Sequence, residues 1–162
     1  MRNIYSKTRI LVAVLIAQGA IAYANGSDEL VDADRRGRAL EGRDVVAYFS
    51  LESSGEAVVG IESYTYEWNG ASWWFSNSEN LETFQADPER FAPKYGGYCS
   101  MAMAKDKVVH ANPDAWTIRD GTLYLFARKA GRKTWRDDPP QYIALADGHW
   151  ANHVAQLAES IE

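Results

Sequence analysis

The chain has 162 residues, of which 46% are hydrophobic and 24% charged, and it contains six tryptophans, nine tyrosines and five phenylalanines. This composition excludes a disordered, collagen-like or low-complexity protein, and the length suits one domain with its own core. Seventeen basic residues against 22 acidic ones give a net charge of −5, so the chain lacks the positive charge with which nucleic-acid-binding proteins attract phosphates.

The first 24 residues have the three parts of a secretory signal peptide. Basic residues precede an apolar stretch over residues 10–22, and Ala22-Tyr23-Ala24 supplies small residues at a cleavage site. We therefore expect a signal peptide over residues 1–24 and a periplasmic or secreted mature protein. The apolar stretch is shorter than the about 20 residues that a membrane span requires, so no stable membrane insertion is expected after cleavage.

Cleavage after Ala24 would remove Arg2, Lys7 and Arg9 and no acidic residue, leaving 14 basic residues against 22 acidic ones. A surface with this charge would repel nucleic acids and anionic lipids. The one cysteine, Cys99, has no partner for an internal disulfide, although disulfides commonly stabilise small exported domains. The fold is therefore expected to depend on its hydrophobic core.

Residues 25–39 are polar and predict a flexible leader, and residues 40–162 form the predicted domain. A run of β-forming residues over 44–49 predicts a strand. The runs 63–68 and 71–76 predict a hairpin, because Asn69-Gly70 between them tolerates the positive φ angles of a tight turn. A helix should follow, with Ser76 or Ser78 as its N-cap, and Pro88 should end or restart it.

The second half of the domain is predicted to begin with a close approach of the backbone at Gly96-Gly97 and a short helix over 100–104. A second hairpin is predicted over 115–127, turning at Asp120-Gly121. From residue 128 the pattern is helical, with Asp138-Pro139-Pro140 as a helix start and an apolar stripe formed by Trp150, Val154, Leu157 and Ile161. The fold class is α+β: a small antiparallel sheet built from two hairpins, packed with helices, and a helical C-terminal end.

Six segments together resemble the YHS domain, and in particular the exported single-domain YHS proteins of bacteria. The segments are LEGRDVVAYF (40–49), NGASWWFS (69–76), FQADPERF (84–91), PKYGGYCS (93–100), NPDAW (112–116) and DGTLYL (120–125). The resemblance extends from about Leu40 to Trp150, which is most of the mature chain. It implies a compact sheet-and-helix unit, and metal binding through cysteines in some members; most exported members have no assigned activity.

This chain departs from the metal-binding members of that family at the positions of their cysteines. Ala47, Ser76 and Asn80 stand where the resemblance would place those cysteines. A cysteine-cluster site for zinc or copper is therefore not expected at the inherited place.

Every sulfur atom of the mature chain lies in the segment from Cys99 to Met103. Monovalent copper prefers thiolate and thioether ligands, and imidazole can complete its coordination, so Cys99, Met101, Met103 and His110 form the candidate metal site. In a strand the three sulfur side chains would share one face. In a helix Cys99 and Met103 would align and Met101 would turn away.

Two other interpretations of this segment remain open. Cys99 and the methionines are residue types that often fill cores, which would leave a metal-free protein-interaction module. Alternatively, Cys99 is a redox thiol that acts with a partner protein or a small thiol, since the chain has no second cysteine to resolve a disulfide. Nucleophilic catalysis would also need an oriented histidine, and only Asp106 and Asp114 are acids close to His110 in sequence.

No catalytic signature of paired carboxylates, a Ser-His-Asp triad or a phosphate-binding loop is recognisable in the sequence. His149 and His153 are four residues apart on a predicted helix, a spacing that can hold a metal, but it also arises by chance on a solvated helix face. The leading prediction is an exported YHS-type protein that binds or handles a soft metal ion such as copper through the Cys99 segment. If the chain binds no metal ion, its expected binding partner is another protein.

Overall fold

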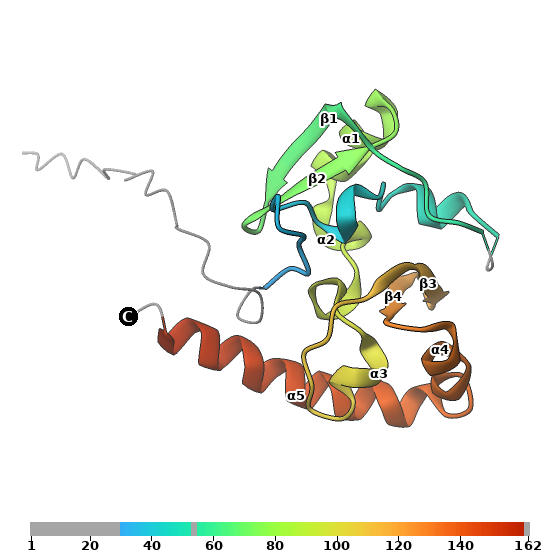
Figure 1. The fold of residues 1–162 in the computed structure, drawn as a ribbon, viewed down its shortest axis with the longest axis vertical. Coiled ribbons are helices and arrows are strands. Elements are labelled where there is room, and N and C mark those ends of the chain that lie inside the picture. The colour runs from blue at the N-terminus through green and yellow to red at the C-terminus, as the bar shows by residue number, and fades with distance from the viewer. Residues whose placement is uncertain (1–29, 53–54, 161–162) are drawn as a thin grey trace, which may run out of the picture.

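The computed structural model describes residues 30–52 and 55–160, so the predicted signal peptide and residues 25–29 lie outside the described part. Two antiparallel hairpins, several short helices and one long C-terminal helix build the domain (Figure 1). The predicted α+β class and the helical C-terminal end are confirmed. The long helix lies along one side of the molecule, and the first hairpin lies at the opposite end.

The first hairpin consists of β1 (Ile61–Trp68) and β2 (Ala71–Phe75), which pair antiparallel as predicted. Its turn residues Asn69 and Gly70 have φ angles of 54° and 79°, the left-handed conformation that a two-residue turn requires. Successive side chains of a strand point to opposite faces, and on β2 the buried ones are Ala71, Trp73 and Phe75.

Two helices follow this hairpin, and the first of them packs on its buried face. In α1 (Ser78–Ala86) Phe84 is fully buried and its ring stacks on Trp73 at 5.1 Å. The N-cap of α1 is Asn77, whose side chain accepts a hydrogen bond from the Asn80 amide, so the predicted serine caps are wrong by one position. Asp87 caps a second short helix, α2 (Pro88–Phe91), which Pro88 starts.

The second hairpin, β3 (Asn112–Arg119) and β4 (Thr122–Phe126), separates two hydrophobic clusters. One face of β4 carries Leu123 and Leu125 into a cluster with the first hairpin, α1 and α2. The opposite face carries Tyr124 and Phe126 into a cluster with the C-terminal helices. Both faces of β4 are buried because successive side chains point to opposite faces of the strand, and each face packs in one of the two clusters.

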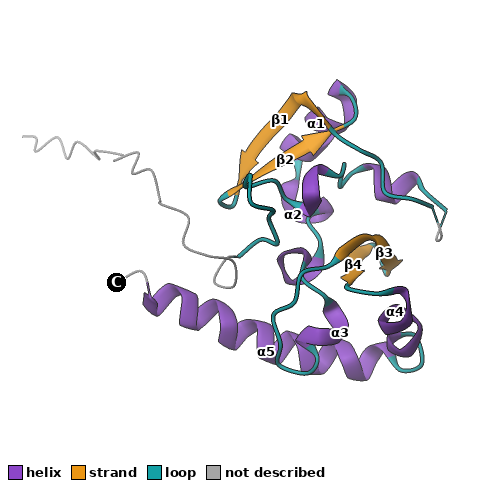
Figure 2. Cartoon of the chain, viewed as in Figure 1, coloured by secondary structure: helices purple, strands orange, loops and turns teal. Residues whose placement is uncertain are grey.

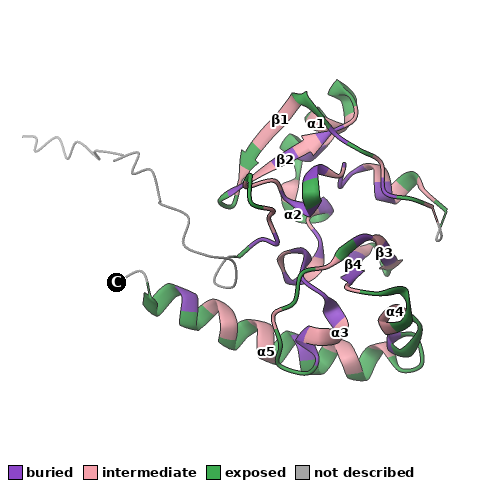
Figure 3. Cartoon of the chain, in the orientation of Figure 1, coloured by how far each residue is buried: buried purple, intermediate pink, exposed green. Residues whose placement is uncertain are grey.

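The 3₁₀ helices η1 (Leu40–Gly42) and η2 (Ala47–Ser50) contribute Leu40 and Tyr48 to the first cluster, and the other elements surround the second cluster. They are η3 (Lys94–Gly97), α3 (Ser100–Met103), α4 (Lys129–Trp135) and the 22-residue helix α5 (Pro139–Ser160). Trp135 of α4 and Ala146 of α5 are buried there, whereas much of the rest of α5 is exposed (Figure 3). In the predicted apolar stripe Leu157 is buried and Trp150 and Val154 are half-buried; Ile161 lies outside the described residues.

The two hairpins form two separate two-stranded sheets instead of the single sheet that was expected (Figure 2). The free edge of β2 is occupied by residues 37–39. The Ser72 amide donates to the Gly37 carbonyl at 2.8 Å, and the Ser72 carbonyl accepts from the Ala39 amide at 3.0 Å. These hydrogen bonds use that edge of β2 at Ser72, where a strand of the second hairpin would otherwise have to pair.

The predicted strand over 44–49 is wrong, because this segment contains the 3₁₀ helix η2 (Ala47–Ser50). The Asp44 carboxylate accepts hydrogen bonds from the amides of Val46 and Ala47, and these local bonds turn the chain despite its β-forming residues. Residues 30–39 also differ from the expected flexible leader. Val31 is buried there, and the Asp32 amide donates to the Gly96 carbonyl at 2.8 Å.

Candidate functional site

The Cys99 segment is helical, which separates the three sulfur side chains. The Met103 amide donates to the Cys99 carbonyl at 2.9 Å, so Cys99 and Met103 lie one above the other on α3, and both are buried, with 5% and 1% of their surface exposed. Met101 turns away from them and lies near Gly131 of α4. The cysteine belongs to the cluster around Tyr95, Tyr98 and Trp135, which also contains Met103.

His110, the fourth candidate ligand, is engaged elsewhere. Its Nδ1 lies 2.6 Å from Oδ1 of Asp32, and the other oxygen of that carboxylate accepts a hydrogen bond from the Ala111 amide at 2.8 Å. The His110 side chain is 60% exposed, whereas that of Asp32 is nearly buried. Burial raises the pKa of the Asp32 carboxyl above its ordinary value, although its hydrogen bonds with His110 and Ala111 act in the opposite direction.

The acid that orients His110 was not found by sequence reasoning. Asp32 is 78 residues away in the chain, whereas the two nearby acids have other roles: Asp114 accepts a hydrogen bond from the Ala57 amide, and Asp106 lines a pocket. Residues 30–34 were expected to belong to the flexible leader, so Asp32 was not considered as a partner of His110. His110 and Asp32 therefore form a histidine–carboxylate pair at the surface, whereas the Cys99 thiol is buried.

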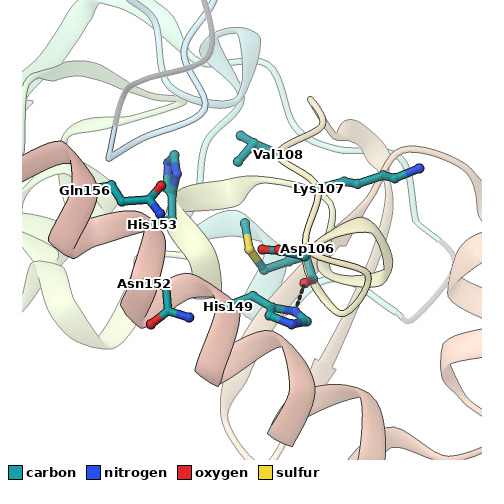
Figure 4. A pocket seen from close by; sticks show the side chains of 8 residues that line it. Asp106, Lys107, Val108, His149, Asn152, His153 and Gln156 are labelled. Atoms are coloured by element: carbon teal, nitrogen blue, oxygen red, sulfur yellow. Dashed lines mark hydrogen bonds between the residues drawn. The ribbon is translucent and has the colours of Figure 1, made fainter.

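A pocket of about 310 Å³ lies between α5 and the loop that follows α3 (Figure 4). It contains Met103, one of the predicted metal ligands, and both histidines of the predicted helical pair. Its lining residues are Met103, Asp106, Lys107, Val108, His149, Asn152, His153 and Gln156. The fold thus brings together two groups of candidate ligands that are 46 residues apart in sequence.

The two imidazoles of this pocket have different surroundings. Nδ1 of His149 lies 2.9 Å from the Met103 carbonyl oxygen. Nε2 of His153 is shielded from solvent and has no hydrogen-bond partner. Figure 4 shows the His149 ring directed toward the loop and the His153 ring beside Gln156, so the two rings point toward different ends of the pocket.

The positions at which the family resemblance would place cysteines meet around the Asp44 carboxylate. Asp44 is fully buried, and its Oδ2 accepts hydrogen bonds from the hydroxyl of Ser76 at 2.6 Å and the side-chain amide of Asn80 at 2.7 Å. The backbone amide of Ser76 donates to the same oxygen, and the amide of Ala47 donates to Oδ1. A buried carboxylate with several donors occupies this place and connects η2, the residue that follows β2, and α1.

The described residues contain no group of three or more histidine, cysteine, aspartate or glutamate side chains that could hold a metal ion. In the same part of the chain, no helix combines the length and apolar character needed to cross a membrane.

Comparisons with protein-family models, with curated proteins and with solved structures found no match to this chain.

Proposed function

We propose that this is an exported YHS-type protein that binds a soft metal ion of the copper type. The donors are Met103 of the Cys99 segment and His149 of α5, which line the same pocket. Thioether and imidazole groups are ligands that monovalent copper accepts. Cys99 and Met101 support the site by packing α3 against the core and against α4.

The observation that carries the proposal is the hydrogen bond between His149 and the carbonyl of Met103. A carbonyl oxygen only accepts hydrogen bonds, so Nδ1 of His149 carries the proton. In the neutral imidazole the lone pair then resides on Nε2. Histidines that bind metals usually have this arrangement, with one ring nitrogen bonded to a carbonyl or carboxylate and the other free for the ion.

A metal-free interaction module is the second candidate function. The observation that favours it is the burial of Cys99 and Met103, because buried sulfur side chains are commonly part of a core. The two candidates differ in one measurable property: only the first predicts a ligand that stabilises the folded protein in the absence of any partner.

The proposal includes export of the protein and removal of its signal peptide. The basic residues, the apolar stretch over 10–22 and the small residues before Asn25 support it. The mature protein is therefore residues 25–162, and mass spectrometry of periplasmic material should find Asn25 at its N-terminus.

The proposal is tested by the melting temperature of the mature protein with and without monovalent copper, under anaerobic conditions with ascorbate. A ligand at 100 times its Kd adds about 2.7 kcal/mol to the stability of the folded state, so the wild type should melt at a clearly higher temperature with copper. Met103→Leu conserves volume and should reduce this shift, while it costs less than about 1.5 kcal/mol without metal.

Met101→Leu is the matched control, since Met101 belongs to the same short helix but lies near α4. This variant should keep the full copper-dependent shift. The absence of a shift in the wild type would contradict metal binding and favour the interaction module. A shift of the same size in Met103→Leu would place the ion at other residues and overturn the proposed site.

A further inference from the structure

The pocket contains a polar atom without a partner. Nε2 of His153 has less than 1 Å² of exposed surface and makes no hydrogen bond among the described residues. A buried polar group in this state is less stable than one that forms a hydrogen bond. Such groups are rare in folded proteins and call for a physical explanation, such as a bound water or ion or a catalytic role.

We propose that His153 is a second imidazole ligand, so that His149, His153 and Met103 form a site that selects monovalent copper. This inference rests on the proposed function and deepens it by naming the ligand set and the ion. The proposed site contains two histidines and one methionine. It is therefore a different kind of site from a cluster of three histidine, cysteine or carboxylate side chains, which the described residues do not contain.

The helix places the ligands at suitable positions. His149 and His153 are four positions apart in α5 and therefore lie on the same side of it, about one turn apart. Asn152 and Gln156 also line the pocket, so this side of α5 faces the loop after α3 along two turns. Met103 is the last residue of α3 and lines the pocket, and its carbonyl oxygen accepts the hydrogen bond from His149.

One imidazole must turn for both to reach a single ion, because the rings point to different ends of the pocket (Figure 4). His149 is held in place by its hydrogen bond to Met103. Nε2 of His153 has no hydrogen bond to lose, and its ring contacts Trp150 at 5.4 Å. Rotation of the His153 side chain therefore replaces a ring contact with a bond to the metal ion. We infer that His153, and not His149, rotates when the ion binds.

The donor set determines the ion. Zinc sites in proteins use cysteine thiolates, imidazoles and carboxylates, and methionine is not among these ligands. A thioether selects monovalent copper, and imidazole is compatible with it. Two imidazoles and one thioether should therefore bind monovalent copper more tightly than zinc.

The experiment uses the mature protein labelled with ¹⁵N-histidine and observes the imidazole nitrogens by NMR during addition of monovalent copper under ascorbate. We expect Nε2 of both His149 and His153 to shift, and Nδ1 of His149 to keep its proton. Copper-dependent shifts at His149 with none at His153 would overturn the inference while leaving the proposed function intact. No shift at either imidazole, together with no thermal stabilisation, would contradict the proposed function as well.

Competition with a colorimetric chelator of monovalent copper gives the affinities of variants. His153→Ala and His153→Gln should weaken copper binding about 10-fold or more, since even the outer partners of metal ligands contribute that much. Asn152→Ala and Gln156→Ala are matched controls, because both residues line the pocket from α5 without being ligands. Unchanged affinity in both His153 variants, or equal affinity of the wild type for zinc, would contradict the assignment.

Discussion

At Cys99 the thiol is part of the core that holds α3 in place. The residue sits at the N-cap of α3 without a side-chain capping bond, and its amide donates to the Val109 carbonyl at 2.9 Å. Its side chain packs in the cluster that contains Tyr95 and Tyr98. Because the thiol is buried, reaction with an added disulfide reagent should be slow in the native protein and fast after unfolding, unlike that of an exposed redox thiol.

The substitution Cys99→Ser tests the role of the buried thiol. The hydroxyl replaces a weakly polar thiol in an apolar environment, so the free energy of unfolding should fall by about 1–3 kcal/mol. Chemical denaturation of both proteins without metal measures the difference. An unchanged or higher stability would contradict this account and would mean that the serine hydroxyl bonds a backbone amide at the start of α3.

Asp32 provides a pH-dependent prediction. Burial raises the pKa of its carboxyl in the folded protein, with a smaller contribution from the negative charge of Glu41. A raised pKa means that ionisation is less favourable in the folded state than in the unfolded state. The contribution of Asp32 to stability is therefore fully present below the ordinary pKa of aspartate, about 3.9, and is lost as the pH rises through the higher folded-state value.

The comparison with Asp32→Asn isolates this effect, because asparagine does not titrate. The stability of the wild type minus that of the variant should fall as the pH increases from about 3 to about 6. Denaturant unfolding at several pH values measures it. A difference that rises with pH would show that the hydrogen bonds of His110 and Ala111 outweigh the desolvation of the carboxylate.

At the level of elements, the two hairpins and α3 were predictable and the arrangement of the candidate ligands was not. Asn69-Gly70 and Asp120-Gly121 adopt positive φ angles that few other pairs tolerate, so a local signal sufficed. The strand prediction for segment 44–49 failed because the Asp44 carboxylate accepts hydrogen bonds from the nearby Val46 amide and from the Ser76 amide, 32 residues along the chain. The pocket depends on the packing of α5 against α3 and the loop that follows it, which no local pattern encodes.

The Asp44 carboxylate gives a prediction about how elements are joined. Asn80 of α1 donates to Asp44 from a different element, and removal of this donor in Asn80→Ala leaves a buried charge with fewer hydrogen bonds. We expect a loss of about 1.5–3 kcal/mol in the free energy of unfolding. Glu82→Ala is the control, because Glu82 is exposed on the same helix and its loss should cost within about 0.5 kcal/mol. Equal effects of the two substitutions would contradict a joining role for Asp44.

At the scale of the whole molecule, the second hairpin couples the two hydrophobic clusters. Trp116, Leu123 and Leu125 contribute to the cluster of the first hairpin, and Ala115, Tyr124 and Phe126 contribute to the cluster of the C-terminal helices. Neither cluster can lose this hairpin without exposing apolar surface of the other. We therefore expect one cooperative unfolding transition, as for most small domains.

The substitution Leu125→Ala tests this coupling from one side of the hairpin. Leu125 is fully buried in the first cluster, so its truncation should cost about 2–5 kcal/mol. Fluorine-labelled tryptophan resolves the two clusters by NMR, since Trp73 reports on the first and Trp135 on the second. Both signals should lose their native positions at one denaturant concentration in the wild type, and both midpoints should fall together in Leu125→Ala. If only the Trp73 transition moved, the hairpin would join two independently folding units and the shared-core account would be wrong.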